Sequence, residues 1–143
     1  MGKKRIVKKS GEPSARGATR ASQRTSRRRL EAGTLYIEAT YNNTKLSLAD
    51  GSGNVVAWST SGALGFSGAR KGTPFAAAKV GELIAEKAET MGMKDVAVVV
   101  SGVGAGRESS IRAFASRGFH LSSIKDVTPV PHNGPRPPKP RRV

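Results

Sequence analysis

Apolar and polar positions alternate along residues 35–41, as expected of a β-strand with one face in a core and one face in solvent. On this pattern Tyr41 falls on the core side with the aliphatic residues. An Asn-Asn pair follows and suits a two-residue turn, because Asn tolerates a positive φ. A second, antiparallel strand is expected around residues 46–48, and a Gly-rich turn leads into a third strand at 55–58. The start of the body is thus predicted to be a three-stranded meander.

The hydrophobic period changes from that of a strand to that of a helix after residue 73. Thr73 is a suitable N-cap, proline suits the first helical position after it, and Gly92 suits the C-terminal end. The apolar stripe between them consists of Ala76, Val80, Leu83, Ile84, Ala88 and Met91. We interpret this helix as architectural, because burial of the stripe accounts for its pattern.

Residues 95–100 form an apolar run without alternation, which is typical of a strand buried on both faces. Three closely spaced glycines follow, and a second helix is predicted over residues 109–118, with Phe114 on its apolar face. A last strand is expected at 121–127. The order of three strands, helix, strand, helix and strand predicts an α/β body at residues 33–128, in which helices pack on a mixed sheet.

The glycine turn before the second helix is the first candidate site. Glycine has no Cβ atom, so the backbone can bend tightly there and another chain can come close. A helix that begins at such a turn presents unpaired N–H groups and the positive end of its dipole, which suits phosphate. Arg107 adds a planar fork of donors. We therefore expect Gly104, Gly106 and Arg107 to hold a phosphate group.

Charge is distributed unevenly along the 143 residues, which carry a net charge of +15. Residues 1–29 contain 11 Lys or Arg and one acid, residues 132–143 contain four bases and no acid, and the middle is almost neutral. Basic ends on a neutral body usually neutralise a polyanion. With no cysteine and only two histidines, disulfides and a metal site built from these residues are not expected. No apolar run is long enough to span a membrane.

The N-terminal arm, residues 1–32, has few large aliphatic side chains among its charges and is predicted to be disordered when free. A solubilising tail is one alternative. An organelle transit peptide is another, although the arm lacks the apolar stripe of an amphipathic helix. We favour an arm that becomes ordered on nucleic acid. Its expected RNA contacts are Arg24, Arg27, Arg28 and Arg29.

A 14-residue connection, residues 59–72, contains four glycines, and long ordered loops in compact domains are usually functional. Phe66 lies close in sequence to Arg70 and Lys71, and an aromatic ring beside two cations suits a stacked base and a bound phosphate. The alternative is a solvated loop with Phe66 packed inward. Further RNA contacts are expected from the first turn, at Asn42, Asn43 and Lys45.

The C-terminal tail, residues 129–143, holds six of the eight prolines and is predicted to run extended, at about 3.1 Å per residue. Because it is stiff, basic and free of acids, it suits a groove between phosphate backbones. The alternative is a proline-rich ligand for an SH3-type domain. The expected RNA contacts are His132, Asn133, Gly134, Arg136, Lys139, Arg141 and Arg142.

Two enzyme interpretations are weaker. A dinucleotide-binding fingerprint fails because Arg107 stands where the third glycine belongs, and because no second half-domain follows Asp126. A metal-dependent nuclease needs clustered carboxylates, whereas Glu38, Asp50 and Asp126 each have a simpler role on a strand surface or in a turn. The residues therefore indicate a binding protein without catalysis and without a cofactor.

Four long motifs in this chain resemble the family of small-subunit ribosomal protein eleven, and the resemblance covers roughly residues 30–143. The motifs begin at Ala39, Gly65, Gly106 and Asp126 and read ATYNNT, GFSGARKGTPFAA, GRESSIRA and DVTPVPHNGPRPPK. Two positions depart from the family pattern. Val103 replaces a usual proline in the glycine turn and frees one φ angle, and Pro135 replaces Cys or Val and stiffens the tail.

The resemblance implies a bacterial-type member with a three-layer, ribonuclease-H-like fold, built on a mixed five-stranded sheet and used without nuclease activity. It implies binding to small-subunit ribosomal RNA on the platform of a cytoplasmic rather than an organellar ribosome. There the protein would lie near messenger RNA at the exit region, beside small-subunit proteins seven and eighteen, with no membrane and no small-molecule substrate. The alternatives are a general nucleic-acid packaging protein and a ribonuclease-H-like nuclease.

Overall fold

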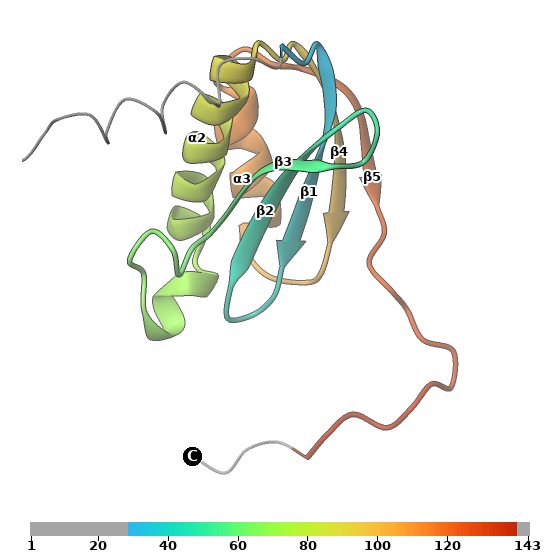
Figure 1. The fold of residues 1–143 in the computed structure, drawn as a ribbon. Coiled ribbons are helices and arrows are strands. Elements are labelled where there is room, and N and C mark those ends of the chain that lie inside the picture. The colour runs from blue at the N-terminus through green and yellow to red at the C-terminus, as the bar shows by residue number, and fades with distance from the viewer. Residues whose placement is uncertain (1–28, 140–143) are drawn as a thin grey trace, which may run out of the picture.

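The computed structural model describes residues 29–139, whose regular elements are strands, two α-helices and a short 3-10 helix (Figure 1). Most of the predicted N-terminal arm and the last four residues lie outside this range, and with them Arg24, Arg27, Arg28, Arg141 and Arg142. In chain order the elements are β1 (Ala32–Ala39), β2 (Thr44–Asp50), β3 (Val55–Thr60), η1 (Gly68–Gly72), α2 (Pro74–Met91), β4 (Asp95–Ser101), α3 (Gly106–Ala115) and β5 (His120–Asp126). The predicted order of strands and α-helices is confirmed.

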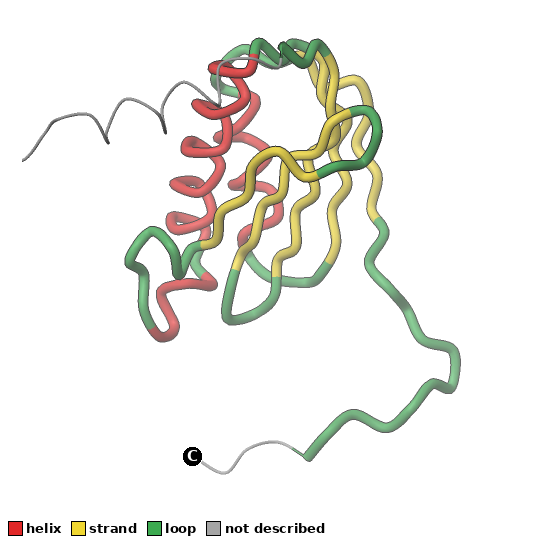
Figure 2. The backbone as a smooth tube through the Cα atoms, in the orientation of Figure 1, coloured by secondary structure: helices red, strands yellow, loops and turns green. Residues whose placement is uncertain are grey.

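The strands form one mixed, five-stranded sheet in the order β3-β2-β1-β4-β5 (Figure 2). β1 pairs antiparallel with β2, and β2 with β3, so the predicted meander is confirmed. β1 also pairs parallel with β4, and β4 pairs parallel with β5. Alternation holds through β1, where Leu35, Ile37 and Ala39 are fully buried. The strand ends at Ala39, however, so Tyr41 lies in the following turn with 78% of its side chain exposed, and its expected place in the core was wrong.

Both α-helices cover the same face of the sheet, which gives two layers in the described residues instead of the expected three (Figure 1). The crossover from β3 through α2 to β4 and the crossover from β4 through α3 to β5 run in the same direction across the sheet. Because crossovers between parallel strands are right-handed, two crossovers in one direction place their helices on one face. α2 and α3 therefore pack against each other as well as on the sheet.

The central strand β4 shows the consequence of this two-layer arrangement. Val96, Val98 and Val100 belong to the buried core, whereas the alternate residues Ala97 and Val99 are only partly buried. The expectation that this apolar run is buried on both faces was wrong, because no described helix covers the second face. On that open face Tyr36, which lies beside Val99 in the register, is 41% exposed.

The first helix, α2, begins and ends where the sequence predicts. Thr73 Oγ1 accepts a hydrogen bond from Ala76 N (3.3 Å), and the helix ends at Gly92, which has a φ of 80°. Its packing depends on a small residue that the apolar stripe did not include. A Cβ atom on Gly81 would lie 2.8 Å from the carbonyl oxygen of Ser110, so α2 and α3 approach too closely for a side chain at this position.

The second helix, α3, begins at Gly106, earlier than the predicted residue 109. Phe114 is its main core residue: the side chain is fully buried, and its ring stacks on that of Phe119 with centroids 4.4 Å apart. This aromatic pair completes a core built by aliphatic side chains of the sheet and of α2. The largest of these are Leu35, Ile37, Leu46, Leu48 and Ile84.

Beyond β5 the chain leaves the body in neither a helix nor a strand, as predicted for the tail (Figure 1). Val127 N donates a hydrogen bond to Val100 O (2.8 Å), which extends the pairing with β4 by one residue. From residue 129 to residue 139 every residue is exposed. Asn133 has a φ of 52°, so the tail bends at this position.

Candidate nucleic-acid interface

Three loops gather at the edge of the sheet where β1 and β4 end: turn 40–43, loop 61–73 and turn 102–105 (Figure 2). We call this edge the loop rim. Ser61 N donates to Thr44 O (3.0 Å), and Gly104 N donates to Ala39 O (2.8 Å). Loop 61–73 and turn 102–105 are therefore both hydrogen-bonded to the hairpin that β1 and β2 form with turn 40–43. β1 and β4 are parallel, and their carboxyl ends therefore meet at one edge. The sequence segments that carry the predicted loop contacts are thus brought together.

The glycine turn packs against its own chain. A Cβ atom on Gly102 would lie 2.1 Å from Ala39 O, and one on Gly104 would lie 2.2 Å from Thr40 O. A Cβ atom on Gly106 would lie 2.4 Å from Thr44 Oγ1. The β1–β2 hairpin thus fills the space that a side chain at these glycines would need. The expectation that the glycines leave room for another molecule is corrected. Gly104 and Gly106 are buried, and an RNA contact through either stays a prediction.

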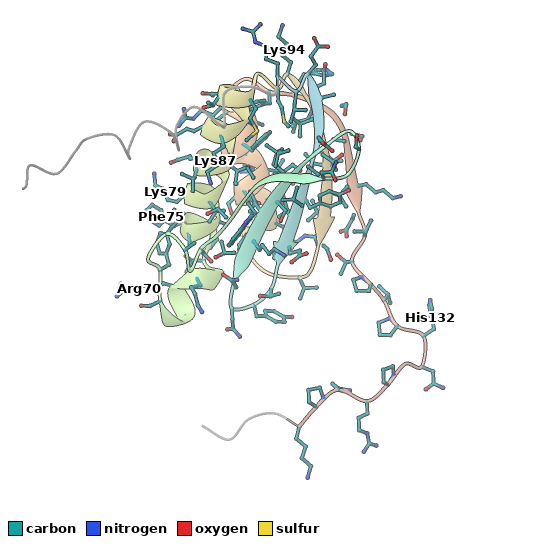
Figure 3. All side chains as sticks on the ribbon, in the orientation of Figure 1. Arg70, Phe75, Lys79, Lys87, Lys94 and His132 are labelled. Atoms are coloured by element: carbon teal, nitrogen blue, oxygen red, sulfur yellow. The ribbon has the colours of Figure 1, made fainter. Side chains whose placement is uncertain are left out.

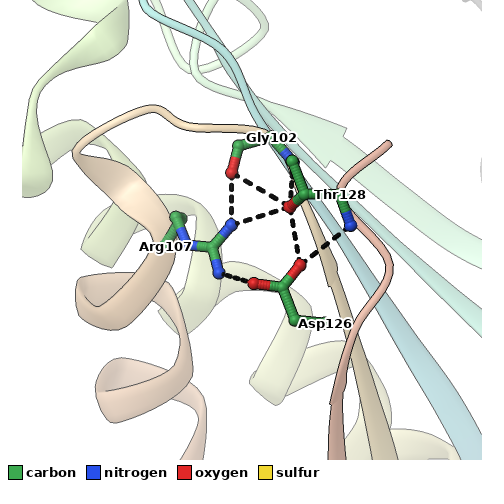
Figure 4. Close-up of polar contacts among 4 residues, drawn as sticks. All are labelled: Gly102, Arg107, Asp126 and Thr128. Carbon is green, nitrogen blue, oxygen red and sulfur yellow. Dashed lines mark hydrogen bonds and ion pairs between the residues drawn. The ribbon is translucent and has the colours of Figure 1, made fainter. Parts of the chain in front are cut away.

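Arg107 turns back from the start of α3 toward the glycine turn and the end of β5 (Figure 4). Its Nη1 donates to Gly102 O and to Thr128 Oγ1 (3.1 Å), and its Nη2 pairs with Asp126 Oδ2. The Asp126 carboxylate also accepts from Thr128 N (2.8 Å) and from the Thr128 hydroxyl (2.6 Å). Gly102 N donates to Thr128 Oγ1 (3.2 Å). This cluster joins the glycine turn, α3 and the first residues of the tail.

The cluster corrects the expectation that Arg107 presents its donors outward as a phosphate fork. Both terminal nitrogens of the guanidinium group bond within the chain, and its side chain is 31% exposed. We therefore assign Arg107 a structural role, in which it fixes where the tail leaves the body. An additional contact between Arg107 and RNA stays a prediction.

Replacing Thr128 by valine is expected to raise the pKa of Asp126, because the hydrogen bond from the Thr128 hydroxyl is the largest cause of its depression. The pKa of Asp126 is lowered from 3.8 to about 2, first by the hydrogen bond from the Thr128 hydroxyl, then by the Thr128 N–H, and then by Arg107. Because this pKa is depressed in the folded protein, the contacts of the Asp126 carboxylate stabilise the fold fully above about pH 4. This stabilisation is lost as the pH falls toward 2 and the carboxylate is protonated. A carboxyl-carbon NMR titration of Thr128→Val and of the unchanged protein measures the shift, and an unchanged pKa of Asp126 in the variant would contradict the assignment.

Turn 40–43 is held mainly by Thr40 and Asn43. Thr40 N donates to Asn43 O (2.9 Å), and Asn43 N donates to Thr40 Oγ1 (3.1 Å). The side-chain oxygen of Asn43 lies 2.7 Å from Ser61 Oγ, which also links this turn to loop 61–73. Lys45 pairs with Glu38 at 3.4 Å. Of the three predicted contacts in this segment, Asn42 is exposed, whereas Asn43 and Lys45 are partly buried and have partners within the chain.

Phe66 is partly buried, with its ring edge against that of Phe75 at a centroid distance of 6.0 Å. Both rings line a surface groove of about 410 Å³ together with Leu64 and Leu83. The structure therefore supports the alternative in which Phe66 packs on the body. Stacking of Phe66 on an RNA base stays a prediction.

Arg70 and Lys71 lie in η1, on the same loop. Arg70 is exposed at the outer side of this short helix, whereas Lys71 is partly buried (Figure 3). Within residues 29–139, neither side chain forms an ion pair with an acid. Their backbone is anchored, because Thr73 Oγ1 donates to Arg70 O (2.7 Å). These two cations thus remain available at the loop rim.

The predicted contacts of the described tail are all exposed, as is Arg29 ahead of β1. Figure 3 shows His132 on the tail, away from the sheet and helices. These tail residues are His132, Asn133, Gly134, Arg136 and Lys139. His132 therefore lies apart from the body in this structure, and RNA contacts through the tail residues stay a prediction.

The three acids considered for a nuclease site have separate roles. Asp126 belongs to the Arg107 cluster, Glu38 pairs with Lys45, and Asp50 accepts hydrogen bonds from the backbone of the turn after β2. No group of three or more His, Cys, Asp or Glu residues among residues 29–139 is arranged to hold a metal ion. In the same range no helix is long and apolar enough to cross a membrane.

Two features of the site were missed from the sequence. The first is the cluster around Arg107, whose only sequence signal is the spacing of Asp126 and Thr128, two residues apart in an extended segment. The second is the exposure of Tyr41, which the alternating pattern placed in the core. Its position next to the Asn-Asn turn was the signal that the strand had already ended.

The geometry defines a class of protein: a small two-layer α/β domain that presents cations on anchored loops at one sheet edge and carries a basic tail. A comparison with protein families identifies the particular family. The chain matches the family model of ribosomal protein S11 over residues 33–142 and belongs to that family. It is therefore a structural ribosomal protein, which binds ribosomal RNA within the small subunit and serves translation.

Proposed function

We propose that this protein helps to shape the platform of the small ribosomal subunit near the messenger exit region, without catalysis. The observation that carries the proposal is the match to the S11 family over almost all of the body and tail. In this proposal the protein is a bacterial-type member in a cytoplasmic ribosome. Small-subunit proteins seven and eighteen are its neighbours, and messenger RNA passes close by.

The loop rim and the basic ends divide the binding of RNA between them in this proposal. The body is nearly neutral, so most of the electrostatic attraction comes from the arm and the tail. The loop rim supplies fixed contacts, because loop 61–73 is hydrogen-bonded to turn 40–43 and to β2, and turn 102–105 is hydrogen-bonded to β1. Phosphate contacts of this kind set the position of a protein on its RNA. The globular domain at residues 33–128 thus places the rim, while the ends at 1–32 and 129–143 hold the polymer.

A competition experiment tests this function against general packaging of nucleic acid. The full chain is bound to transcribed small-subunit ribosomal RNA, and duplex DNA is added as competitor. For a specific RNA-binding protein we expect little displacement until the DNA is present in roughly a thousandfold excess of phosphate. Displacement at equal phosphate concentrations would favour a packaging protein. Co-sedimentation with the small subunit through a high-salt gradient is the second expected result.

The ribonuclease-H-like relationship is part of the same proposal, supported by the mixed five-stranded sheet. We expect no cleavage of an RNA–DNA hybrid when the protein is incubated with magnesium or manganese. The three candidate acids are each engaged elsewhere, which supports this expectation. Cleavage that follows the protein through purification would contradict a purely structural role.

A further inference from the structure

Tyr41 is the most exposed large apolar side chain among the described residues, and it lies in the middle of the loop rim. Its side chain is 78% exposed, compared with 41% for Tyr36, the other tyrosine of the chain. Within residues 29–139 its ring makes no aromatic pair, whereas Phe66, Phe75, Phe114 and Phe119 all do. The ring thus adds nothing evident to the packing of the body.

The backbone of Tyr41 is held on both sides by the neighbouring loops. A Cβ atom on Gly72 would lie 2.1 Å from Tyr41 O, so loop 61–73 packs directly on this peptide. Turn 102–105 packs on the preceding peptide, because a Cβ atom on Gly104 would lie 2.2 Å from Thr40 O. The hydrogen bonds between Thr40 and Asn43 close the turn around Tyr41. A ring on such a support has little backbone freedom left to lose on binding.

Polar residues flank Tyr41 in the sequence, and two cations lie on the loop that packs on its peptide. Its sequence neighbours are polar, with Thr40 on one side and Asn42 on the other. Gly72, which touches its carbonyl group, directly follows Arg70 and Lys71, and neither of these is paired with an acid in the described part of the chain. Exposed large apolar side chains also occur on the neighbouring loops, at Leu64 and Val103, but none adjoins Tyr41 in the sequence. A nucleotide would find a π-face for its base and positive charge for its phosphate.

We propose that Tyr41 is a stacking site for one unpaired base of ribosomal RNA, with the adjoining phosphate held by Arg70 and Lys71. The proposal rests on the RNA-binding function proposed above and adds a specific contact to it. Loop 61–73 has two roles in this arrangement: Gly72 packs on the peptide of Tyr41, and the two cations directly precede this glycine in the sequence. The phenol ring suits the role because a flat, rigid side chain stacks at a low cost in entropy.

Substitutions at Tyr41 test the proposal on the full chain, with transcribed small-subunit ribosomal RNA as the probe. Tyr41→Ala is expected to lower the affinity about 5- to 150-fold, the range for losing one stacked base. Tyr41→Phe keeps the π-face and is expected to bind within about threefold of the unchanged protein. Tyr36→Ala is the matched control: it removes the other exposed tyrosine from the open sheet face, and no loss is expected.

The dependence of affinity on salt separates stacking from charge. Because stacking neutralises no phosphate, the slope of log K against log salt is expected to be the same for Tyr41→Ala and for the unchanged protein. Thermal unfolding is expected to be unaltered as well, since Tyr41 is 78% exposed.

Several results would overturn the stacking site. They are a Tyr41→Ala affinity within threefold of the unchanged protein, an equal loss in Tyr41→Phe, or a loss seen only when other small-subunit proteins are present. The last result would assign the ring to a protein contact. If the unchanged chain fails to prefer ribosomal RNA over duplex DNA, the proposed function fails, and that outcome is distinct from a failure at Tyr41 alone.

Discussion

Deleting residues 1–28 is expected to remove most of the salt dependence with which this protein binds small-subunit ribosomal RNA. The deleted segment carries 10 Lys or Arg and one acid. Each neutralised phosphate contributes about 0.7–0.9 to the slope of log K against log salt, so about ten contacts give a slope between about −7 and −9. Without the segment we expect a slope of about −3 to −4, which four contacts from the bases of the tail account for. Leu30 N, which donates to Met91 O (3.1 Å), is retained in the shortened chain.

A length-matched variant distinguishes charge from chain length in this experiment. Changing the 10 bases of residues 1–28 to glutamine is expected to reduce the slope as much as the deletion does. Removing residues 140–143 takes away two bases and is expected to change the slope by about 1–2. A slope that survives the deletion would mean that the arm serves solubility and makes no contact with the RNA.

Replacing Gly102 by alanine is expected to lower the free energy of unfolding by about 3–5 kcal/mol, because two separate costs add. The first is backbone strain, since Gly102 has a φ of 97°, where a residue with a side chain costs about 1–3 kcal/mol. The second is steric: the new Cβ atom would lie 2.1 Å from Ala39 O, and the end of β1 must move. Urea unfolding followed by circular dichroism measures the loss.

Gly118→Ala is the matched control for this substitution. Gly118 has a φ of 88°, but a Cβ atom there meets nothing within 4 Å. It therefore carries the strain without the clash, and a loss of about 1–3 kcal/mol is expected. Equal losses at the two positions would show that the close approach of β1 to the glycine turn adds no cost. A loss at Gly102 that clearly exceeds the loss at Gly118 confirms the contact.

Local signals predicted the parts of the fold that depend on neighbouring residues. Thr73 and Gly92 marked both ends of α2, because a cap is satisfied by residues within one helical turn. The alternating pattern located β1, but it continued to Tyr41, two residues beyond the end of the strand at Ala39. The candidate site was predicted only as segments. Loops 42–45, 66–72 and 102–107 were each selected by residue type, and nothing local required them to meet.

Contacts between distant residues changed the roles of individual side chains. Arg107 has the side chain and the sequence position expected of a phosphate ligand, yet its terminal nitrogens bond to Asp126 and Thr128. Phe66 was selected as an aromatic ring beside cations, but Phe75 lies against it. Each partner is on another element, and the pairing depends on the path of the chain between them. A pattern of residue types holds no information on such a pairing until the sheet order is known.

The amino-acid sequence determined the order of the elements, the near-neutral body with its basic ends, and membership in the S11 family, because these follow from local pattern, charge and motif order. Only the tertiary structure decided that both helices cover one face, that the glycines pack on β1, and that Tyr41 is exposed. These features depend on the direction of two crossovers and on close contacts between loops far apart in the chain. Such contacts are set by the packing of the whole domain, and no short stretch of residues encodes them.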